Sequence, residues 1–151
     1  MKENHTIREY NKADKATVLN LLRLNTPRYF SPEEEHDLIY YLEHEIDRYF
    51  LLEMNHKVVG CGGINFSENN TLGKISWDFF HPDFQGKGLG TLLLKHRIDL
   101  LQNTKGITKI IVRTSQHTHL FYEKGGFVLT EIVKNYWAEG YDLYTMEYLS
   151  L

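Results

Sequence analysis

Several residue types that define whole classes of protein are scarce in this 151-residue sequence. Its single cysteine, Cys61, has no partner for a disulfide within the chain, which is typical of a reducing cytoplasm. No stretch approaches the roughly 18 apolar residues that a membrane helix needs. The first ten residues, MKENHTIREY, lack the apolar centre of a signal peptide. We therefore expect a cytosolic protein without a membrane partner.

Positive charge is not in excess either. The 17 lysines and arginines are outnumbered by 20 acidic residues, which gives a net charge of −3, and no basic patch stands out, so nucleic acid is not an expected partner. Metal-ligand patterns are also scarce: His117 and His119 form one close pair, without a clear third ligand, so we expect no metal. What remains is a globular composition, 25% charged and 13% aromatic, of a length that suits one domain over residues 1–151.

The first third of the chain predicts one strand and two helices. Residues 5–10 form a short polar–apolar segment that we expect to be an edge strand, and a helix follows Asn11. Ser31, Pro32 and Glu34 form a helix start signal, with an N-cap, a proline at the first position and a capping box. The residues expected on the buried stripes are Val18, Leu21 and Leu22 in the first helix and Leu38, Leu42 and Ile46 in the second.

The rest of the chain predicts six strands and two more helices. YFLLEMNHKVVGCGGINF indicates two strands joined by a turn at residues 55–57, and KISWDFF a third. A helix over about 88–102 precedes the strand ITKIIVRT, and a short helix, SQHTHLFYEK, ends at the glycines 125 and 126. FVLTEIV and YDLYTMEYL are two final strands, separated by an aromatic loop, KNYWAEG. The order β-α-α-β-β-β-α-β-α-β-β indicates a mixed α/β fold with a mostly antiparallel sheet.

Three glycines, Gly86, Gly88 and Gly90, stand where a strand ends and a helix begins. Unpaired amides and a partial positive charge at a helix start attract anions, and glycine lets the anion approach the backbone closely. The pattern therefore indicates a phosphate or pyrophosphate site, although a tight turn that packs helix against sheet would use the same glycines. A Walker loop is excluded because no Gly-Lys-Ser/Thr occurs, and a dinucleotide fingerprint fails because Thr91 and Leu93 stand where it needs glycine.

The segment QGKGLG, residues 85–90, resembles the acyl-CoA-binding motif of the GNAT superfamily of N-acetyltransferases, Gln/Arg-x-x-Gly-x-Gly/Ala. A second segment, FYEKGGF at 121–127, is similar to the FYEKLGF segment of that family, with Gly125 in place of leucine. The expected element order also agrees with the GNAT fold over nearly the whole chain. The resemblance implies an acetyl-CoA-dependent N-acetyltransferase that works by direct attack in a ternary complex.

The resemblance also assigns residues to acetyl-CoA. Main-chain amides of Gln85, Gly86, Lys87, Gly88, Leu89, Gly90 and Thr91 would hold the pyrophosphate. The strand end at Asp78, Phe79 and Phe80 would lie along the acetyl and pantetheine amides, between two strands that splay apart, 74–80 and 109–114. Ser115 would meet pantetheine, or cap the following helix, or do both.

Acetyl transfer from a thioester to an amine requires an amine that loses its proton and a thiolate that gains one. Tyr122 matches the family tyrosine that protonates the departing thiolate, with a packing role as the alternative. The base stays open among Asp78, the three histidines His81, His117 and His119, and ordered water. Cys61 lies in a strand, where we expect it to pack in the core rather than carry the acetyl group.

The acceptor would enter between the loops NTPRYFSPEEE and KNYWAEGYD. Their aromatic residues, above all Tyr29, Phe30 and Trp137, would line the entrance with Tyr136 and Tyr141. Five acids, Glu33, Glu34, Glu35, Glu139 and Asp142, would attract a cationic amine, unless they only cap helices and solvate loops. We expect a small-molecule amine or a peptide N-terminus as the acceptor.

Three alternatives stay open at this point. The same glycine loop would serve a non-catalytic module that senses acyl-CoA. A longer acyl group, such as succinyl or propionyl, would need a wider pocket than Phe79 and Phe80 suggest. The final strand, with alternating Tyr144, Met146 and Tyr148, would suit either the core or the interface of a homodimer.

Overall fold

The computed structural model describes residues 4–149; residues 1–3 and 150–151, the two ends of the predicted 1–151 domain, lie outside the described residues. The predicted order of strands and helices is confirmed, with two short 3₁₀ helices added at 12–14 and 82–84. The elements are β1 (His5–Glu9), α1 (Lys15–Leu24), α2 (Glu34–His44), β2 (Arg48–Met54), β3 (Lys57–Ser67), β4 (Leu72–Phe80), α3 (Leu89–Gln102), β5 (Lys109–Thr114), α4 (His119–Lys124), β6 (Phe127–Ala138) and β7 (Tyr141–Tyr148).

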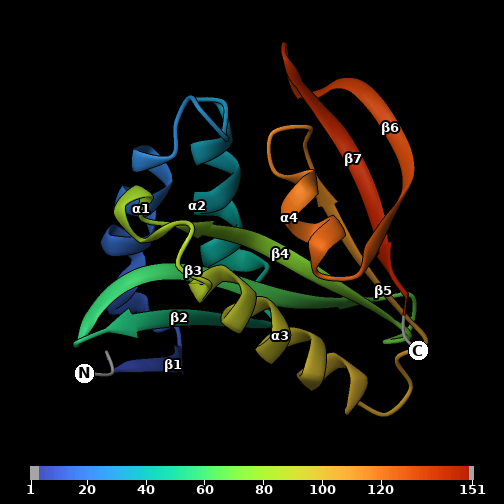
Figure 1. Ribbon diagram of the computed structural model, residues 1–151, viewed down its shortest axis with the longest axis horizontal. Coiled ribbons are helices and arrows are strands. Elements are labelled where there is room, and N and C mark those ends of the chain that lie inside the picture. The colour runs from blue at the N-terminus through green and yellow to red at the C-terminus, as the bar shows by residue number, and fades with distance from the viewer. Residues whose placement is uncertain (1–3, 150–151) are drawn as a thin grey trace.

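The seven strands form one sheet in the order β1-β2-β3-β4-β5-β7-β6. Neighbouring strands are antiparallel except β4 and β5, which are parallel and are connected through α3. The mixed, mostly antiparallel α/β fold predicted from the sequence is confirmed. Figure 1 shows the hairpin of β6 and β7 diverging from the part of the molecule that carries α1 and α2.

Two apolar cores cover the two faces of the sheet. One core joins α1 and α2 to the sheet and includes Val18, Leu38 and Phe79. The other joins α3 and α4 to the opposite face and includes Leu93 and Phe80. Because consecutive residues of a strand point to opposite faces, Phe79 and Phe80 enter different cores. The end of β4 is therefore fixed from both sides.

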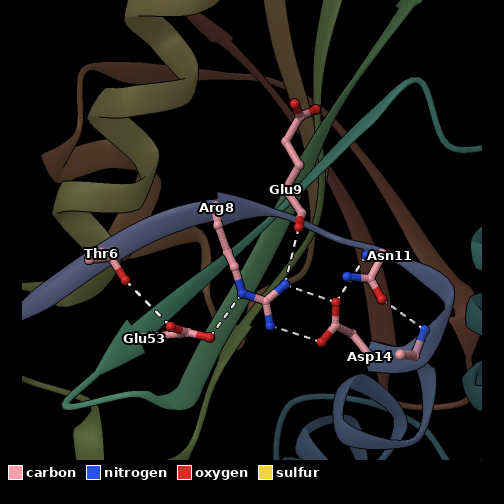
Figure 2. A network of polar contacts seen from close by, with 7 residues as sticks. Thr6, Arg8, Glu9, Asn11, Asp14 and Glu53 are labelled. Atoms are coloured by element: carbon pink, nitrogen blue, oxygen red, sulfur yellow. Dashed lines mark hydrogen bonds and ion pairs between the residues drawn. The ribbon is translucent and has the colours of Figure 1, made fainter.

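The network around Arg8 fastens the edge strand β1 to the start of α1 (Figure 2). The guanidinium donates two hydrogen bonds to the carboxylate of Asp14, each 2.9 Å, and a third, also 2.9 Å, to Glu53 on β2. The backbone N–H of Asn11 donates to the same Asp14 carboxylate over 2.9 Å. The hydrogen bond from Arg8 lowers the pKa of Asp14, so its charged form is favoured in the folded protein.

Three details of the predicted elements were wrong. Most of KNYWAEG is strand and not loop: β6 continues to Ala138, and its pairing with β7 is irregular between Val133 and Ala138, where Asn135 takes the left-handed region at φ 53°. Ile46 lies beyond the end of α2, because that helix already ends at His44. The helix α2 begins at Glu34 with Glu33 at its N-cap, two residues later than the start predicted from Ser31 and Pro32. The predicted left-handed glycine after α4 is present: Gly126 has φ 103°.

Within residues 4–149, none of the helices has the length and apolar character needed to cross a membrane.

Candidate active site

A bulge in β4 determines which way its last residues point. Gly63 pairs with Ser76 and Cys61 with Phe79, so Trp77 and Asp78 together stand opposite Gly62 on β3. Trp77 takes the left-handed region, at φ 47°, and its carbonyl accepts a hydrogen bond of 2.7 Å from the hydroxyl of Tyr49. Without the bulge, Asp78 would share a face with Ser76. With it, Asp78 points towards α3.

The strands β4 and β5 separate just beyond this region. Their parallel pairing covers Leu72 to Ile75 and Lys109 to Val112, and it stops there although β4 continues to Phe80. The predicted splay between 74–80 and 109–114 therefore begins later than expected, after Ile75. Figure 1 shows the two strands diverging. The last five residues of β4 keep one strand neighbour, β3, and have no strand paired with them on the side of β5.

Two cavities meet at the separated strands. The larger, of about 530 Å³, is lined by residues of the α1–α2 loop, β4, β5 and the β6–β7 hairpin. The smaller, of about 460 Å³, is lined by the glycine loop, the end of β4 and α4. Both are lined by Asp78 and Tyr122, and also by Tyr29 and Phe30 of the α1–α2 loop. The arrangement offers space for two molecules whose reacting ends would meet beside Asp78.

The glycine loop presents unpaired amides to the smaller cavity. Within residues 4–149, no backbone N–H from Gly86 to Thr91 donates a hydrogen bond to another described residue, whereas the N–H of Leu92 donates to the carbonyl of Gly88 over 3.1 Å. Gly86 and Gly88 have φ values of 75° and 80°, and a Cβ on either would meet nothing within 4 Å. Such a row of amides at a helix start is suited to a phosphate group.

The side chains of Gln85 and Leu89 point away from the loop and contact the neighbouring elements. The amide nitrogen of the Gln85 side chain donates to the carbonyl of Phe80 over 3.0 Å and to the buried Asn25 over 2.9 Å, which connects the loop to the end of α1. Leu89 is buried in the α3 core, so only its backbone faces the loop. The ammonium of Lys87 lies 5.5 Å from the ring of Phe84.

Asp78 holds Tyr122 at the meeting point of the cavities. The hydroxyl of Tyr122 donates a hydrogen bond of 3.0 Å to Oδ2 of Asp78. Burial first, and then the negative charge of Asp78, raise the pKa of Tyr122 well above 10, so this phenol stays protonated around neutral pH. The two residues predicted for catalysis, 44 positions apart in the chain, are therefore in direct contact.

Arg97 completes this cluster, and the sequence reading missed it. Its guanidinium is fully buried and donates to Oδ2 of Asp78 over 2.6 Å, to the carbonyl of Gly63 over 3.3 Å and to the carbonyl of Leu93 over 3.1 Å. A signal was present: Arg97 is four residues after the buried Leu93 and directly before the buried Ile98, and so lies on the apolar face of α3.

The other candidate bases are oriented towards backbone carbonyls or exposed groups. A ring nitrogen of His117 lies 3.1 Å from the carbonyl of Gly140, and one of His119 lies 3.1 Å from that of Gln116. Nδ1 of His81 accepts a hydrogen bond from the N–H of Asp83. Ser115 lines the larger cavity, and its hydroxyl accepts from the N–H of His117 over 3.2 Å, one turn before α4.

Cys61, a residue of β3, is fully buried in the core between the sheet and the helices α1 and α2, and burial raises the pKa of its thiol well above the ordinary value. A thiol in this state is a weak nucleophile. The expected packing role fits this position. Among the described residues 4–149, no three histidine, cysteine or acidic side chains gather as they would around a metal ion.

Aromatic side chains form much of the wall of the larger cavity. Phe30 stacks on Trp77 with 6.2 Å between ring centroids, and the hydroxyl of Tyr141 donates to the carbonyl of Pro27 over 2.5 Å, which joins the two loops predicted to face each other. Nε1 of Trp137 donates to the carbonyl of Thr114 over 3.1 Å. Tyr136, also predicted here, lines neither of the two cavities.

The acids predicted at the entrance mostly serve local structure. Of the five, only Glu34 lines the larger cavity, and its carboxylate accepts a hydrogen bond of 2.8 Å from the N–H of Ser31. Three others bind neighbouring groups: Glu33 the hydroxyl of Ser31, Glu35 the side chain of Arg23, and Asp142 the N–H of Asn135 and the side chain of Lys134.

Two cations line the same cavity instead. Lys74 makes no ion pair or side-chain hydrogen bond with another described residue. Arg113 donates to the hydroxyl of Tyr136 over 2.8 Å and has no carboxylate partner among residues 4–149. The carboxylates of Glu45 and Asp47 line the cavity as well. The cavity therefore offers both signs of charge to a bound molecule.

Comparisons with known proteins agree with this geometry. Residues 16–127 match the model of the acetyltransferase (GNAT) family. The chain is 28% identical over 131 residues to an amino-acid acetyltransferase of Shewanella oneidensis, a match that covers 83% of this chain and 27% of that protein. The chain thus spans about a quarter of the length of this curated relative.

Solved structures resemble the fold over nearly the whole chain. The ribosomal-protein-S18-alanine N-acetyltransferase from Escherichia coli has a TM-score of 0.78 at 21% identity, with 96% of this chain and 93% of that chain covered. An aminoglycoside 6'-N-acetyltransferase complexed with coenzyme A has a TM-score of 0.76 at 16% identity, with 94% and 95% covered. At these identities the likeness concerns the fold.

Proposed function

This chain belongs to the GNAT family of acetyltransferases, and we propose that it transfers the acetyl group of acetyl-CoA to the primary amine of a small molecule or a peptide N-terminus. The observation that carries the proposal is the meeting of two cavities at Asp78 and Tyr122, one of them beside a row of unpaired amides. A transfer reaction needs this arrangement, because donor and acceptor must approach from different sides.

The residues present fit acetyl-CoA in the smaller cavity. The amides from Gly86 to Thr91 suit its diphosphate, and the free edge of β4 before Phe80 suits its pantetheine amides, which would replace the missing strand partner. Acetyl-CoA supplies an activated acyl group as its thioester. Phe79 and Phe80 line the same cavity and favour a short acyl chain over succinyl or propionyl.

In the reaction the amine nitrogen forms a bond to the acetyl carbon, the carbon–sulfur bond breaks, and one proton leaves the nitrogen while one arrives at the sulfur. Tyr122 is protonated and touches both cavities, so it is the proposed hydrogen-bond or proton donor to the sulfur. Asp78 is the proposed carboxylate partner of the amine. Both groups are held by buried contacts before any substrate arrives.

The charges of the larger cavity favour an acceptor that carries a carboxylate as well as an amine. Lys74 and Arg113 lack carboxylate partners among the described residues, while Glu45 and Asp47 offer negative charge to an ammonium group. A free amino acid has both groups, and the curated relative is named for acetyl transfer to amino acids. Among the acceptor classes left open, we therefore propose amino acids first.

The test is the release of coenzyme A thiol from acetyl-CoA with a panel of amines, amino acids and peptides, with the acetylated product identified by mass. The wild type should turn over at least one amino acid. Tyr122→Phe should lower kcat by about 10²- to 10⁴-fold with acetyl-CoA affinity unchanged. Tyr40→Phe, an exposed tyrosine outside both cavities, is the matched control.

The alternative is a non-catalytic module that senses acyl-CoA through the same glycine loop. Binding of acetyl-CoA without thiol release on any amine of the panel would favour the sensor. The cytosol and a homodimer stay predictions that fractionation and light scattering test.

A further inference from the structure

Arg97 is a charged residue in a place where the helix pattern calls for an apolar one. Its side chain has no exposed surface, and it replaces an apolar group between α3 and β3. Burying a guanidinium is strongly unfavourable unless its charge and hydrogen bonds are compensated. Here the compensation comes from two carbonyls and from Asp78, which is itself 6% exposed.

The backbone of β3 is shaped to receive this guanidinium. A Cβ at position 62 would lie 2.5 Å from Nη1 and 2.7 Å from Cζ of Arg97, so only glycine leaves the space. The next residue, Gly63, supplies the carbonyl that Nη1 binds. Two consecutive glycines opposite the bulge of β4 therefore provide the space and one of the hydrogen-bond acceptors for the guanidinium of Arg97.

The two carboxylate oxygens of Asp78 differ in their hydrogen bonds. Oδ2 accepts from both Arg97 and Tyr122, whereas Oδ1 makes no hydrogen bond with a described residue. Among residues 4–149, Ser67 Oγ is the one fully buried side-chain nitrogen or oxygen atom without a hydrogen-bond partner, so Oδ1 of Asp78 keeps accessible surface. Because Asp78 lines both cavities, that surface faces the point where they meet.

We propose that Arg97 is a positioning residue for acetyl transfer: it keeps Asp78 a carboxylate whose Oδ2 orients Tyr122 and whose Oδ1 remains free for the acceptor amine. This role rests on the proposed function. Arg97 itself lines neither cavity and touches no reacting atom; it acts through Asp78.

Arg97 supplies the positive charge that lies beside Asp78. The titratable groups that face it are Arg97 from α3, Tyr122 from α4, Cys61 from β3 and Tyr49 from β2. The last three are buried and have raised pKa values, so they are neutral at physiological pH. Without Arg97, a buried carboxylate among neutral groups takes up a proton more readily, and a protonated Asp78 is a poorer acceptor for Tyr122.

The experiment measures kcat from pH 6 to 9 in the wild type, in Arg97→Met and in the double variant Arg97→Met/Asp78→Asn. At each pH the kcat of a variant is divided by that of the wild type, which cancels the ionisation of the amine. Arg97→Met should show a new acid limb that falls about tenfold per pH unit. The double variant should be slower than wild type but without that limb, because asparagine has no proton to gain.

Two outcomes in an active enzyme overturn the role. In the first, the kcat of Arg97→Met relative to wild type is constant with pH, as a loss of packing alone predicts. In the second, the fall of relative kcat at acid pH persists in the double variant. Arg97→Lys guards against misfolding of the methionine variant. It keeps the charge and loses the fork to the carbonyls of Gly63 and Leu93, so the wild-type pH profile should survive, and a new limb would contradict the role. A wild type that acetylates no amine overturns the proposed function and, with it, this role.

Discussion

Gly62 lies so close to the guanidinium of Arg97 that a Cβ would come within 2.5 Å of Nη1. The glycine is one of three in the strand β3 segment GCGG, where β-branched residues would otherwise be favoured. Its role is to leave room for a buried charge, and the neighbouring Asp78 and Tyr122 depend on that charge for their positions.

Replacing Gly62 by alanine should destabilise the protein by about 1 to 3 kcal/mol, because the guanidinium is fully buried and a shift would disturb its bonds to Asp78 and to two backbone carbonyls. Urea unfolding at neutral pH measures the change. The matched comparison is the same substitution in an Arg97→Met background, where the flexible methionine gives way and the cost should be smaller. An equal cost in both backgrounds would show that the strain lies elsewhere in β3.

Gly88→Ala should weaken the binding of coenzyme A about tenfold, or roughly 1.4 kcal/mol, in titration calorimetry. Gly88 lines the smaller cavity, so a methyl group there would take space beside the bound molecule, and alanine at φ 80° costs about 1 to 2 kcal/mol. Gly140→Ala separates these effects, because Gly140 has a similar φ of 84°, equally open space and no place in either cavity. It should lose similar stability and bind coenzyme A as the wild type does.

Much of the fold followed from the sequence because hydrophobic periodicity and turn residues are local signals. The element order and the glycine loop are of this kind, and the contact between Asp78 and Tyr122 agrees with the family resemblance. What was missed arises from tertiary packing. The bulge at Trp77 is a register shift that no local pattern records. Arg97 was overlooked because a charge on a helix is usually at the surface, although its spacing from Leu93 placed it inside.

The charges that line the larger cavity differ from those expected at the acceptor entrance for a similar reason. Acidic residues in two loops looked free to attract an amine, but most of them bind nearby backbone or basic groups. Lys74 and Arg113 lie on the two strands that separate, which the sequence does not bring together until the topology is known. The expected acidic charges are therefore taken up by local hydrogen bonds and ion pairs. The positive charges in the cavity come together only because β4 and β5 are neighbours in the sheet.

Asp14→Asn should lower the free energy of unfolding by about 1 to 3 kcal/mol at neutral pH, because Arg8 loses a charged acceptor. The pKa of Asp14 is lower in the folded state than in the unfolded chain, so its contribution is complete above the unfolded pKa, near 3.8. It is lost as the pH falls through the folded pKa. Urea titrations from pH 7 down to 2 should show the gap between variant and wild type closing. Glu131→Gln, an exposed residue of β6 without an ion pair among the described residues, should show no such gap.

Lys74→Met should raise the KM for an amino acid about tenfold or more while leaving the KM for acetyl-CoA unchanged. The lysine lines the acceptor cavity and not the smaller one, and it has no competing carboxylate among the described residues. A lost charge-assisted hydrogen bond of about 1.5 to 3 kcal/mol corresponds to this range.

The decisive comparison uses a pair of acceptors that differ in one group, an amino acid and the amine that lacks its carboxylate. If Lys74 binds the carboxylate, the variant should lose its preference for the first member of the pair and treat the second as the wild type does. Lys105→Met, an exposed lysine that lines neither cavity, controls for the change in net charge. Equal losses for both acceptors would mean that Lys74 shapes the cavity without reading the charge of its occupant.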